Sequence, residues 1–135
     1  MEGWEEGVPV GVIIDKRTEK EANYNWEFDA KKMMMRIHAE DRLRIVYVPH
    51  ELNRWNFYEM VLDGSWLGGY INGELKDERN DVPETEGNTK DLKIGATASN
   101  SYNIKGYIAF VAIFNKVLTE KERKKIYETT KELFE

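Results

Sequence analysis

The chain lacks several residue types on which common functions depend. Its 135 residues include no cysteine, three prolines and two histidines. Without cysteine, neither a disulfide framework nor thiolate chemistry can form. No apolar run is long enough to span a bilayer, and the acidic stretch Met1 to Glu6 has no apolar centre, so it is not a signal peptide. We expect no membrane span, and an extracellular or cell-surface location only as part of a longer exported chain.

An excess of positive charge is missing as well. Asp and Glu number 25 against 20 for Lys and Arg, which gives a formal net charge of −5. Basic residues are scattered except near the C-terminus, so no nucleic-acid partner is expected. The chain is 41% hydrophobic, which is enough for one core, and we expect a single domain over residues 1–135. Abundant Lys and Glu without cysteine are typical of a thermophilic source.

What the chain does contain is a series of short alternating segments. In Tyr24 to Phe28, three aromatic residues alternate with two polar ones, which predicts a strand with one apolar face. Three further strands are predicted in the first half of the chain: Val8 to Asp15, Met33 to His38 and Leu43 to Tyr47. In the last of these, we expect Leu43, Ile45 and Tyr47 to share the apolar face.

The middle of the chain specifies a hairpin. Trp55 to Leu62 and Trp66 to Ile71 are predicted strands, joined by a turn at Asp63-Gly64-Ser65. Asn72-Gly73 then predicts a two-residue turn, because both central positions of a type I′ turn need positive φ. Gly68-Gly69 inside the second strand indicates a bulge or the close approach of another group.

The following segments are predicted to be less regular until the last strand. Lys76 to Asn88 is charged and is expected to be a loop, and Leu92 to Gly95 is a short strand. A last strand is predicted over Lys105 to Phe114. Because its run Ile108 to Phe114 is apolar almost without interruption, this strand should lie centrally with both faces covered.

One helix is predicted at the C-terminal end, over about residues 119–134. Thr119 and Glu122 have the spacing of a capping box. The expected apolar stripe is Ile126, Tyr127, Thr130, Leu133 and Phe134, and the residues expected to be solvated are Lys121, Arg123, Lys124, Lys125 and Lys131. The fold class is therefore all-β: an antiparallel jelly-roll sandwich with one C-terminal helix.

Several of these pieces, taken in order, resemble a known family. They are Trp55, Asp63-Gly64, Tyr70 to Gly73, Leu92 to Gly95, Gly106 to Val111, Leu118-Thr119 and Ile126-Tyr127. In this order they resemble the laminin G-like branch of the concanavalin A-like lectin/glucanase superfamily. The resemblance covers Trp55 to Tyr127 and implies a jelly-roll sandwich. Phe57 stands where many members have His, which implies a change in packing only.

The start of the chain departs from that family. Members begin with further strands before the one that Val10 to Lys16 resembles, and this chain has hardly any room for them. Missing strands would leave a sheet edge open, and an open edge can pair with another molecule. We therefore expect a homo-oligomer as one outcome.

The superfamily includes glycoside hydrolases, so carboxylates matter. Retaining enzymes need two carboxylates about 5 Å apart. The resemblance to glucanases implies Glu-x-Asp-x-(x)-Glu along one strand. Glu27 and Asp29 match the first two positions, but Ala30-Lys31-Lys32 stands at the third. We expect no enzymatic activity and solvated carboxylates at both positions. His38 and His50 are expected at the surface.

The resemblance also implies that a calcium site should be considered, since many sandwich lectins bind a calcium ion through oxygen atoms of their loops. Two sets of residues have the right chemistry: Asp29, Glu40 and Asp41, or Asp77, Asp81 and Glu86. Neither set has the spacing of a dedicated calcium loop. We expect no cofactor, and leave a structural calcium ion open.

Sugar binding requires aromatic platforms beside polar groups that can bond hydroxyls. Trp26 and Trp55 are expected in the core. Five residues in turns and loops meet the requirement: Asn53, Arg54, Trp66, Asn100 and Tyr102. The leading hypothesis is a non-catalytic binding module, most of all for carbohydrate. The alternative is a structural or protein-interaction domain of a larger surface, phage or adhesion assembly, with a partner protein in place of a glycan.

Overall fold

The computed structural model describes residues 11–16, 24–29, 31–39, 42–50, 53–84, 92–95 and 106–134. The elements in these ranges are β1 (Gly11–Asp15), β2 (Tyr24–Phe28), β3 (Lys32–Ala39), β4 (Arg42–Pro49), β5 (Tyr58–Asp63), β6 (Trp66–Ile71), β7 (Glu74–Arg79), β8 (Lys93–Ile94) and α1 (Glu120–Lys131). The strands form two antiparallel sheets, with the orders β4-β3-β2-β1-β8 and β5-β6-β7.

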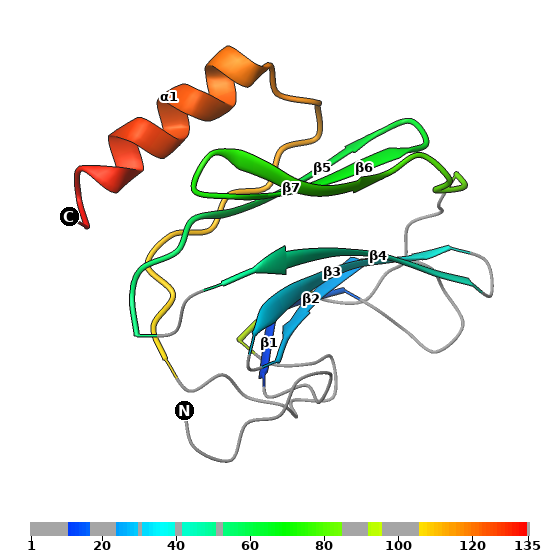
Figure 1. The fold of residues 1–135 in the computed structure, drawn as a ribbon, viewed down its shortest axis with the longest axis horizontal. Helices are drawn as coiled ribbons and strands as arrows, with labels where there is room; N and C mark the ends of the chain where they lie inside the picture. The colour runs from blue at the N-terminus through cyan, green and yellow to red at the C-terminus, as the bar shows by residue number, and fades with distance from the viewer. Residues whose placement is uncertain are drawn as a thin grey trace.

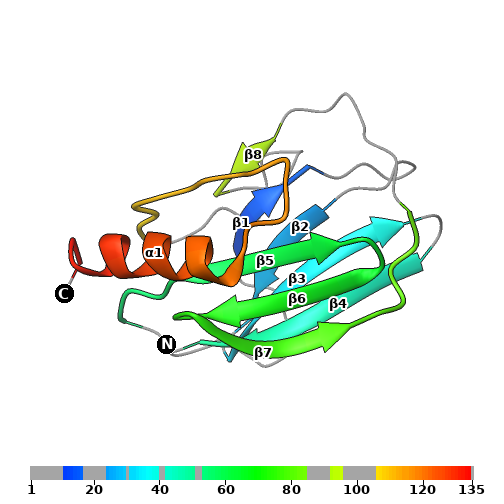
Figure 2. The same cartoon turned by 90° about the horizontal axis from the view of Figure 1, so that it is seen from above.

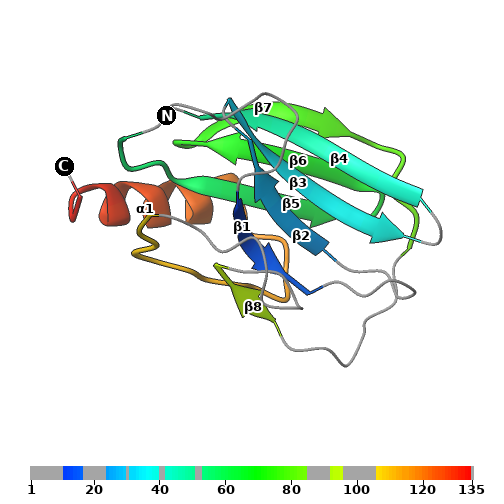
Figure 3. The same ribbon diagram turned by 90° about the horizontal axis from the view of Figure 1, so that it is seen from below.

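The two sheets face each other, and α1 lies on the outer side of the smaller one (Figure 1). The predicted all-β sandwich with one C-terminal helix is therefore confirmed. Figure 3 shows the sandwich from the side of the five-stranded sheet. The core between the sheets is built from Phe28 of β2, from alternate residues of β3, β4 and β6, and from Val82 beyond β7. The residues of β3, β4 and β6 are Met33, Met35, Ile37, Val46, Val48, Leu67 and Ile71. This period of two is what a sheet with one buried face requires.

Strand β4 presents to the core the face opposite to the expected one. The register pairs Met33 with Val48 and Met35 with Val46, and both valines are fully buried. Leu43 and Tyr47 point outward and are 39% and 45% exposed. The prediction was wrong because the composition of β4 is ambiguous, and pairing with β3 decides which face turns inward.

The predicted hairpin is confirmed. Strand β6 has the predicted bounds, whereas β5 begins at Tyr58 rather than Trp55. Asn72 and Gly73 have φ values of 50° and 84°, as their turn requires. The register shifts between Gly69 and Tyr70. A Cβ on Gly69 would lie 2.7 Å from Val48 Cγ2 across the sandwich, so this glycine allows the two sheets to approach.

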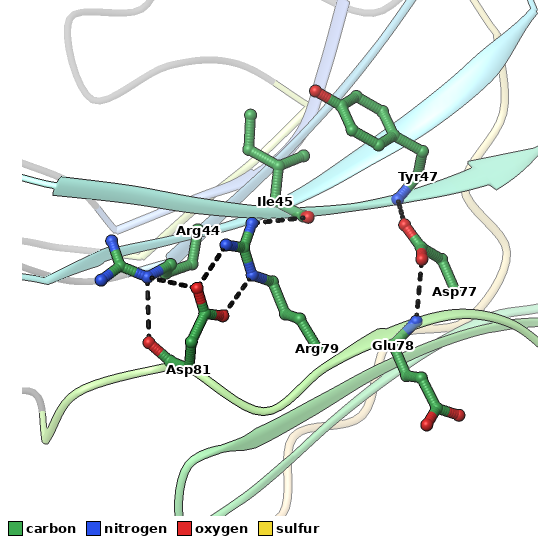
Figure 4. Close-up of polar contacts among 7 residues, drawn as sticks. All are labelled: Arg44, Ile45, Tyr47, Asp77, Glu78, Arg79 and Asp81. Atoms are coloured by element: carbon green, nitrogen blue, oxygen red, sulfur yellow. Dashed lines mark hydrogen bonds and ion pairs between the residues drawn. The ribbon is translucent and has the colours of Figure 1, made fainter.

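Strand β7 continues past Lys76, where a loop was predicted. Asp77 Oδ2 accepts a hydrogen bond from the Tyr47 amide at 2.9 Å, and Arg79 donates to the Ile45 carbonyl at 3.4 Å. These β7 side chains therefore satisfy backbone groups along the open edge of β4. The charged residues that indicated a loop are instead cross-links between the two sheets (Figure 4).

Asp81 completes this cross-link, which we call the latch. Both of its carboxylate oxygens lie 2.6 Å from nitrogen atoms of Arg79, in a bidentate pair. Arg44 of β4 donates to the Asp81 backbone carbonyl at 3.0 Å. One side of the sandwich is therefore closed by charged side chains rather than by apolar packing.

Helix α1 begins as predicted and ends earlier. Thr119 accepts from the Glu122 amide, and the Glu122 side chain accepts from the Thr119 amide, each at 3.1 Å. The helix ends at Lys131, and Leu133, expected in the apolar stripe, is 74% exposed. The capping box fixes the start locally, whereas no comparable cap was available in the sequence to predict where the helix ends.

The helix docks through residues of mixed character. Arg123 was expected to be solvated, but its guanidinium lies 4.1 Å from the centre of the Tyr70 ring and 3.7 Å from Glu59. Tyr127 packs on Phe57, with 5.3 Å between ring centres, and close to Gly73. Arg123 was misjudged because its partners lie on strands far away in the sequence.

The segment predicted as a buried central strand, Lys105 to Phe114, is neither a strand nor buried where it is described. Residues 107–114 carry no strand assignment, and Tyr107 and Ile113 are 88% and 54% exposed. The segment runs past β1, β5 and α1 (Figure 2). An apolar run becomes a strand only where a neighbouring edge pairs with it, and no described strand does so.

Candidate functional site

The outer face of the three-stranded sheet is the best-formed candidate for a ligand surface. Residues of β6 that point away from the core are Trp66, Gly68 and Tyr70. In the register, Trp66 is opposite Asp63 of β5 and Gly68 is opposite Glu78 of β7. Helix α1 lies over one end of this sheet, and no described element covers the other end (Figure 2).

Trp66 supplies an aromatic platform at the uncovered end. A Cβ on Gly68 would collide with the six-membered ring of Trp66, so the missing side chain is what lets the ring extend over the strand. The indole is partly buried, and Asp63 and Glu78 are exposed. A partly exposed ring on a sheet face that also carries exposed carboxylates can stack on an apolar sugar face while the oxygens accept from hydroxyls.

Carboxylates outnumber cations among the charged groups that act on Tyr70 of this face. Burial raises the pKa of Tyr70, and the charges of Glu59, Glu120 and Glu78 raise it further, against the opposing effect of Arg123. Burial also raises the pKa of Glu59, while Arg123 holds it down. These carboxylates would repel an anionic ligand and tolerate a neutral one.

The two other predicted ligand residues that the structure describes, Asn53 and Arg54, do not join Trp66. Asn53 and Arg54 are exposed and precede β5 at the end where it pairs with Ile71, whereas Trp66 pairs at the opposite end. At about 3.4 Å per residue, the length of β5 separates the two ends by roughly 17 Å. Asn100 and Tyr102 lie outside the described residues.

Neither tryptophan expected in the core is fully buried. Trp26 is partly buried and packs against the core cluster. Trp55 is 47% exposed and contacts Phe134, with 5.0 Å between ring centres. Trp55 belongs to the irregular chain before β5, so no strand alternation turns it inward.

Comparison of the sequence with known protein families identifies the superfamily of this sandwich. Residues 8–122 match the Laminin_G_3 family model, described as the concanavalin A-like lectin/glucanases superfamily. The chain belongs to this superfamily. The match begins before β1 and ends in the first turn of α1, so it takes in both sheets of this concanavalin A-like domain.

Two further comparisons add little detail about the concanavalin A-like domain. No curated protein matches it. It is similar in structure to residues 221–444 of an S-layer domain-containing protein from Clostridium thermocellum, with 15% sequence identity and a TM-score of 0.44. That match covers 94% of this chain and 68% of the other.

The glucanase-like carboxylates of the domain are buried, not solvated. Glu27 is 6% exposed, and its carboxylate lies 3.2 Å from Arg36 and accepts from Asn25 at 2.9 Å. Asp29 is fully buried and accepts from two backbone amides while it pairs with Lys32 at 3.0 Å. The expectation of solvation was wrong because neighbouring strands and turns supply these donors.

The two histidines are not at the surface either. His38 is partly buried, with Nε2 3.0 Å from the Asn25 side-chain oxygen. His50 is partly buried beside the rings of Phe28 and Tyr58, at 5.8 and 6.4 Å between centres. His50 therefore packs against rings of the core, whereas His38 lies on the face of β3 that points away from the core, beside Asn25 of β2. The sequence does not state the strand register that brings these groups together.

The candidate calcium ligands that can be placed have other partners. Asp77 and Asp81 are engaged by the latch, and Asp29 by Lys32 and backbone amides. Glu40, Asp41 and Glu86 lie outside the described residues. In the described ranges, no three acidic or histidine side chains gather as metal ligands would. In the same ranges, no helix has the length and apolarity needed to cross a membrane.

Sequence reasoning missed Asp63 and Glu78. Asp63 could have been found, because a hairpin that turns at Gly64-Ser65 places residue 63 opposite Trp66. Glu78 could not, because its place on the face depends on the continuation of β7, and the charged composition of that segment indicates a loop.

Proposed function

We propose that this concanavalin A-like domain is a non-catalytic binding module for a neutral glycan, which docks on the outer face of the three-stranded sheet. The observation that carries the proposal is Trp66, whose ring lies over Gly68. The register partners of Trp66 and Gly68 on the neighbouring strands, Asp63 and Glu78, are both exposed. Stacking on Trp66 and hydroxyl hydrogen bonds to the two carboxylates would hold the sugar.

The charge of the face supports a neutral ligand. Glu59, Glu78 and Glu120 all act on Tyr70, and Arg123, the cation beside them, lies over the Tyr70 ring. A sulfated or uronic sugar would meet carboxylates without a free cation among the groups that shape this face. Because the site is shallow, single-site affinity would be modest and multivalency would strengthen binding.

Binding without cleavage is the simpler chemistry for these residues. A retaining glycosidase needs one carboxylate free to attack and a second to donate a proton. Glu27 and Asp29 are held by Arg36, Asn25, Lys32 and backbone amides, so neither supports such a role. We therefore propose that the bound glycan is left intact.

Calorimetric titration with soluble neutral oligosaccharides, chosen from a glycan array, tests the proposal. We expect Trp66→Ala to weaken binding about tenfold, the loss of one aromatic stacking contact. Trp55→Ala is the matched control, since it removes another partly exposed tryptophan at the far end of β5, and it should leave affinity unchanged. Equal effects of the two variants, or binding only to anionic glycans, would rule out this site.

A second candidate role, protein interaction, rests on a different surface. Residues 107–117 include seven large apolar side chains that are each at least 36% exposed: Tyr107, Ile108, Phe110, Val111, Ile113, Phe114 and Val117. Glycan binding at Trp66 does not need this segment, so the two roles are separable.

A further inference from the structure

The stretch 107–114, which we call the apolar ribbon, is the most unusual surface of this domain. It contains no charged residue, and Tyr107, Phe110 and Ile113 are 88%, 50% and 54% exposed. Residues from both alternating sides of the ribbon are exposed, so no single packing face explains the sequence. Contiguous exposed apolar surface of this kind marks an interaction site.

The backbone of the ribbon has no hydrogen-bond partner within the described part of the chain. Among the described residues, no backbone hydrogen bond joins residues 107–114 to any other segment. Strand β5 pairs with β6 on one side, and no described strand pairs with its other edge. Unpaired N–H and C=O groups along an extended segment are a template for another strand.

A large cavity lies beside the ribbon, with a volume of about 1160 Å³. Its walls include Trp26, Tyr58 and Met60 from the sheets, and Phe110 and Ile113 from the ribbon. Phe110 stacks on Phe57, with 6.5 Å between ring centres, and it is the one ribbon residue for which the described part of the chain supplies a ring contact. The other large side chains of the ribbon are each at least 36% exposed: Tyr107, Ile108, Val111, Ile113 and Phe114.

We propose that the ribbon is the contact surface for a second copy of this chain, paired antiparallel about a two-fold axis. This inference rests on the second candidate role, protein interaction, and is independent of glycan binding. An isologous contact requires a surface that complements itself. An uncharged extended segment does so, since its unpaired backbone groups can bond to the same groups of its copy.

The area of the ribbon and its lack of charge fit a second copy. Each chain carries a formal net charge of −5, which opposes self-association, so the uncharged ribbon is where contact between two copies adds no further local repulsion. With about 150–250 Å² for each aromatic side chain and somewhat less for each isoleucine and valine, the exposed fractions of the three aromatic and three aliphatic side chains amount to roughly 600 Å² per ribbon. Two copies would bury on the order of 1,200 Å², the lower end of stable interfaces.

The first test is mass and amide exchange on the same samples. Light scattering after gel filtration should give twice the monomer mass of 15.9 kDa, falling to the monomer on dilution. Amide hydrogen exchange should show residues 107–114 protected in the dimer and unprotected in the monomer. Protection that persists in the monomer would mean that the ribbon pairs within its own chain, and would overturn the proposal.

Matched lysine variants distinguish a specific role of the ribbon in dimer formation from the general effect of a new surface charge. Ile113→Lys puts a charge from each copy into the interface and should abolish the dimer. Leu133→Lys, at a residue that is 74% exposed outside the ribbon, should not. If Ile113→Lys fails to fold, Tyr107→Lys at an 88% exposed position replaces it. A dimer that survives a folded ribbon variant overturns the proposal, and glycan titration of that variant tests the proposed function separately.

Discussion

Two adjacent glycines, Gly68 and Gly69, serve opposite faces of the same sheet. Gly69 faces the core, where Val46 and Val48 occupy the space of a Cβ, and Gly68 faces outward under the Trp66 ring. The first glycine therefore sets the spacing of the sheets. The second shapes the proposed binding surface.

Alanine at each position should separate these roles. Gly69→Ala forces a methyl group against packed valines and should lower the free energy of unfolding by about 1–3 kcal/mol, measured by urea denaturation. Gly68→Ala should change stability less, because the ring can swing away. It should instead alter tryptophan fluorescence and weaken glycan binding. The opposite ranking of stabilities would contradict this assignment.

The latch carboxylate Asp81 predicts a pH dependence at the residue scale. Its hydrogen bonds to Arg79 lower its pKa from 3.8 to about 2. A lowered folded pKa adds stability above the unfolded pKa of about 4, and that stability is lost as pH falls toward 2. Because Asp81 is solvent-accessible, the effect should be small.

Urea denaturation of the native protein and Asp81→Asn tests this. Their difference in unfolding free energy should be constant above about pH 5 and shrink between about pH 4 and 2. Asp63→Asn, which removes a carboxylate away from the latch, is the control. A difference that grows on acidification would show that Arg79 does not stabilise the ionised form.

At the scale of elements, the start of helix α1 is fixed by a capping interaction between its own first residues. Thr119 and Glu122 satisfy each other's amides, so Thr119→Ala should lower the free energy of unfolding by about 1 kcal/mol. Thr129→Ala, at an exposed position within the helix, is the matched control and should not destabilise. Circular dichroism during urea denaturation measures both, and equal stability of the two variants would deny the cap its role.

The attachment of α1 depends on Arg123. Burial raises the pKa of Glu59, and Arg123 opposes that rise. Arg123→Met should therefore raise the Glu59 pKa further and destabilise the protein at neutral pH, where the carboxylate is ionised and unpaired. The loss should shrink as pH falls and Glu59 binds a proton.

Thermal unfolding of Arg123→Met across the acidic range provides the measurement. Lys124→Met is the control, because Lys124 is exposed on the same helix, and its effect should be small at every pH. A loss for Arg123→Met that stays constant with pH would place the stabilisation in the contact with Tyr70 rather than with Glu59.

At the scale of the whole molecule, one side of the sandwich is closed by the latch and the opposite side exposes the apolar ribbon, residues 107–114. If two copies cover their ribbons together, the thermal midpoint must rise with protein concentration, since association stabilises the folded state by mass action. Scans over about a hundredfold range of concentration should reveal this. A constant midpoint would indicate a stable monomer.

The features that were predicted correctly depend on residues that lie close together in the sequence. Strands β2 and β6 have their predicted bounds, Asn72-Gly73 forms its turn, and Thr119 caps its helix. The strands depend on the alternation of apolar and polar side chains, and the turn depends on residues that tolerate positive φ. The helix cap depends on hydrogen bonds between residues three positions apart. The superfamily could be predicted as well, because these local features occur in a particular order.

Three of the failures involve partners distant in the sequence. The inward face of β4, the continuation of β7 and the docking of Arg123 depend on which strand lies opposite. For the same reason only Trp66 of the five predicted ligand residues is placed on the candidate platform. Asn53 and Arg54 lie at the other end of β5, and the remaining two are outside the described residues.

The sequence by itself therefore determined the strand-rich class, the central hairpin, the helix cap and the superfamily. Local backbone preference and side-chain period suffice for these. Only the tertiary structure decided that Glu27 and Asp29 are buried and paired, that charged β7 side chains bind the edge of β4, and that residues 107–114 lie exposed. Whether a side chain is buried or paired depends on the groups that another part of the chain brings against it. An apolar sequence does not reveal whether another strand edge is present to pair with it.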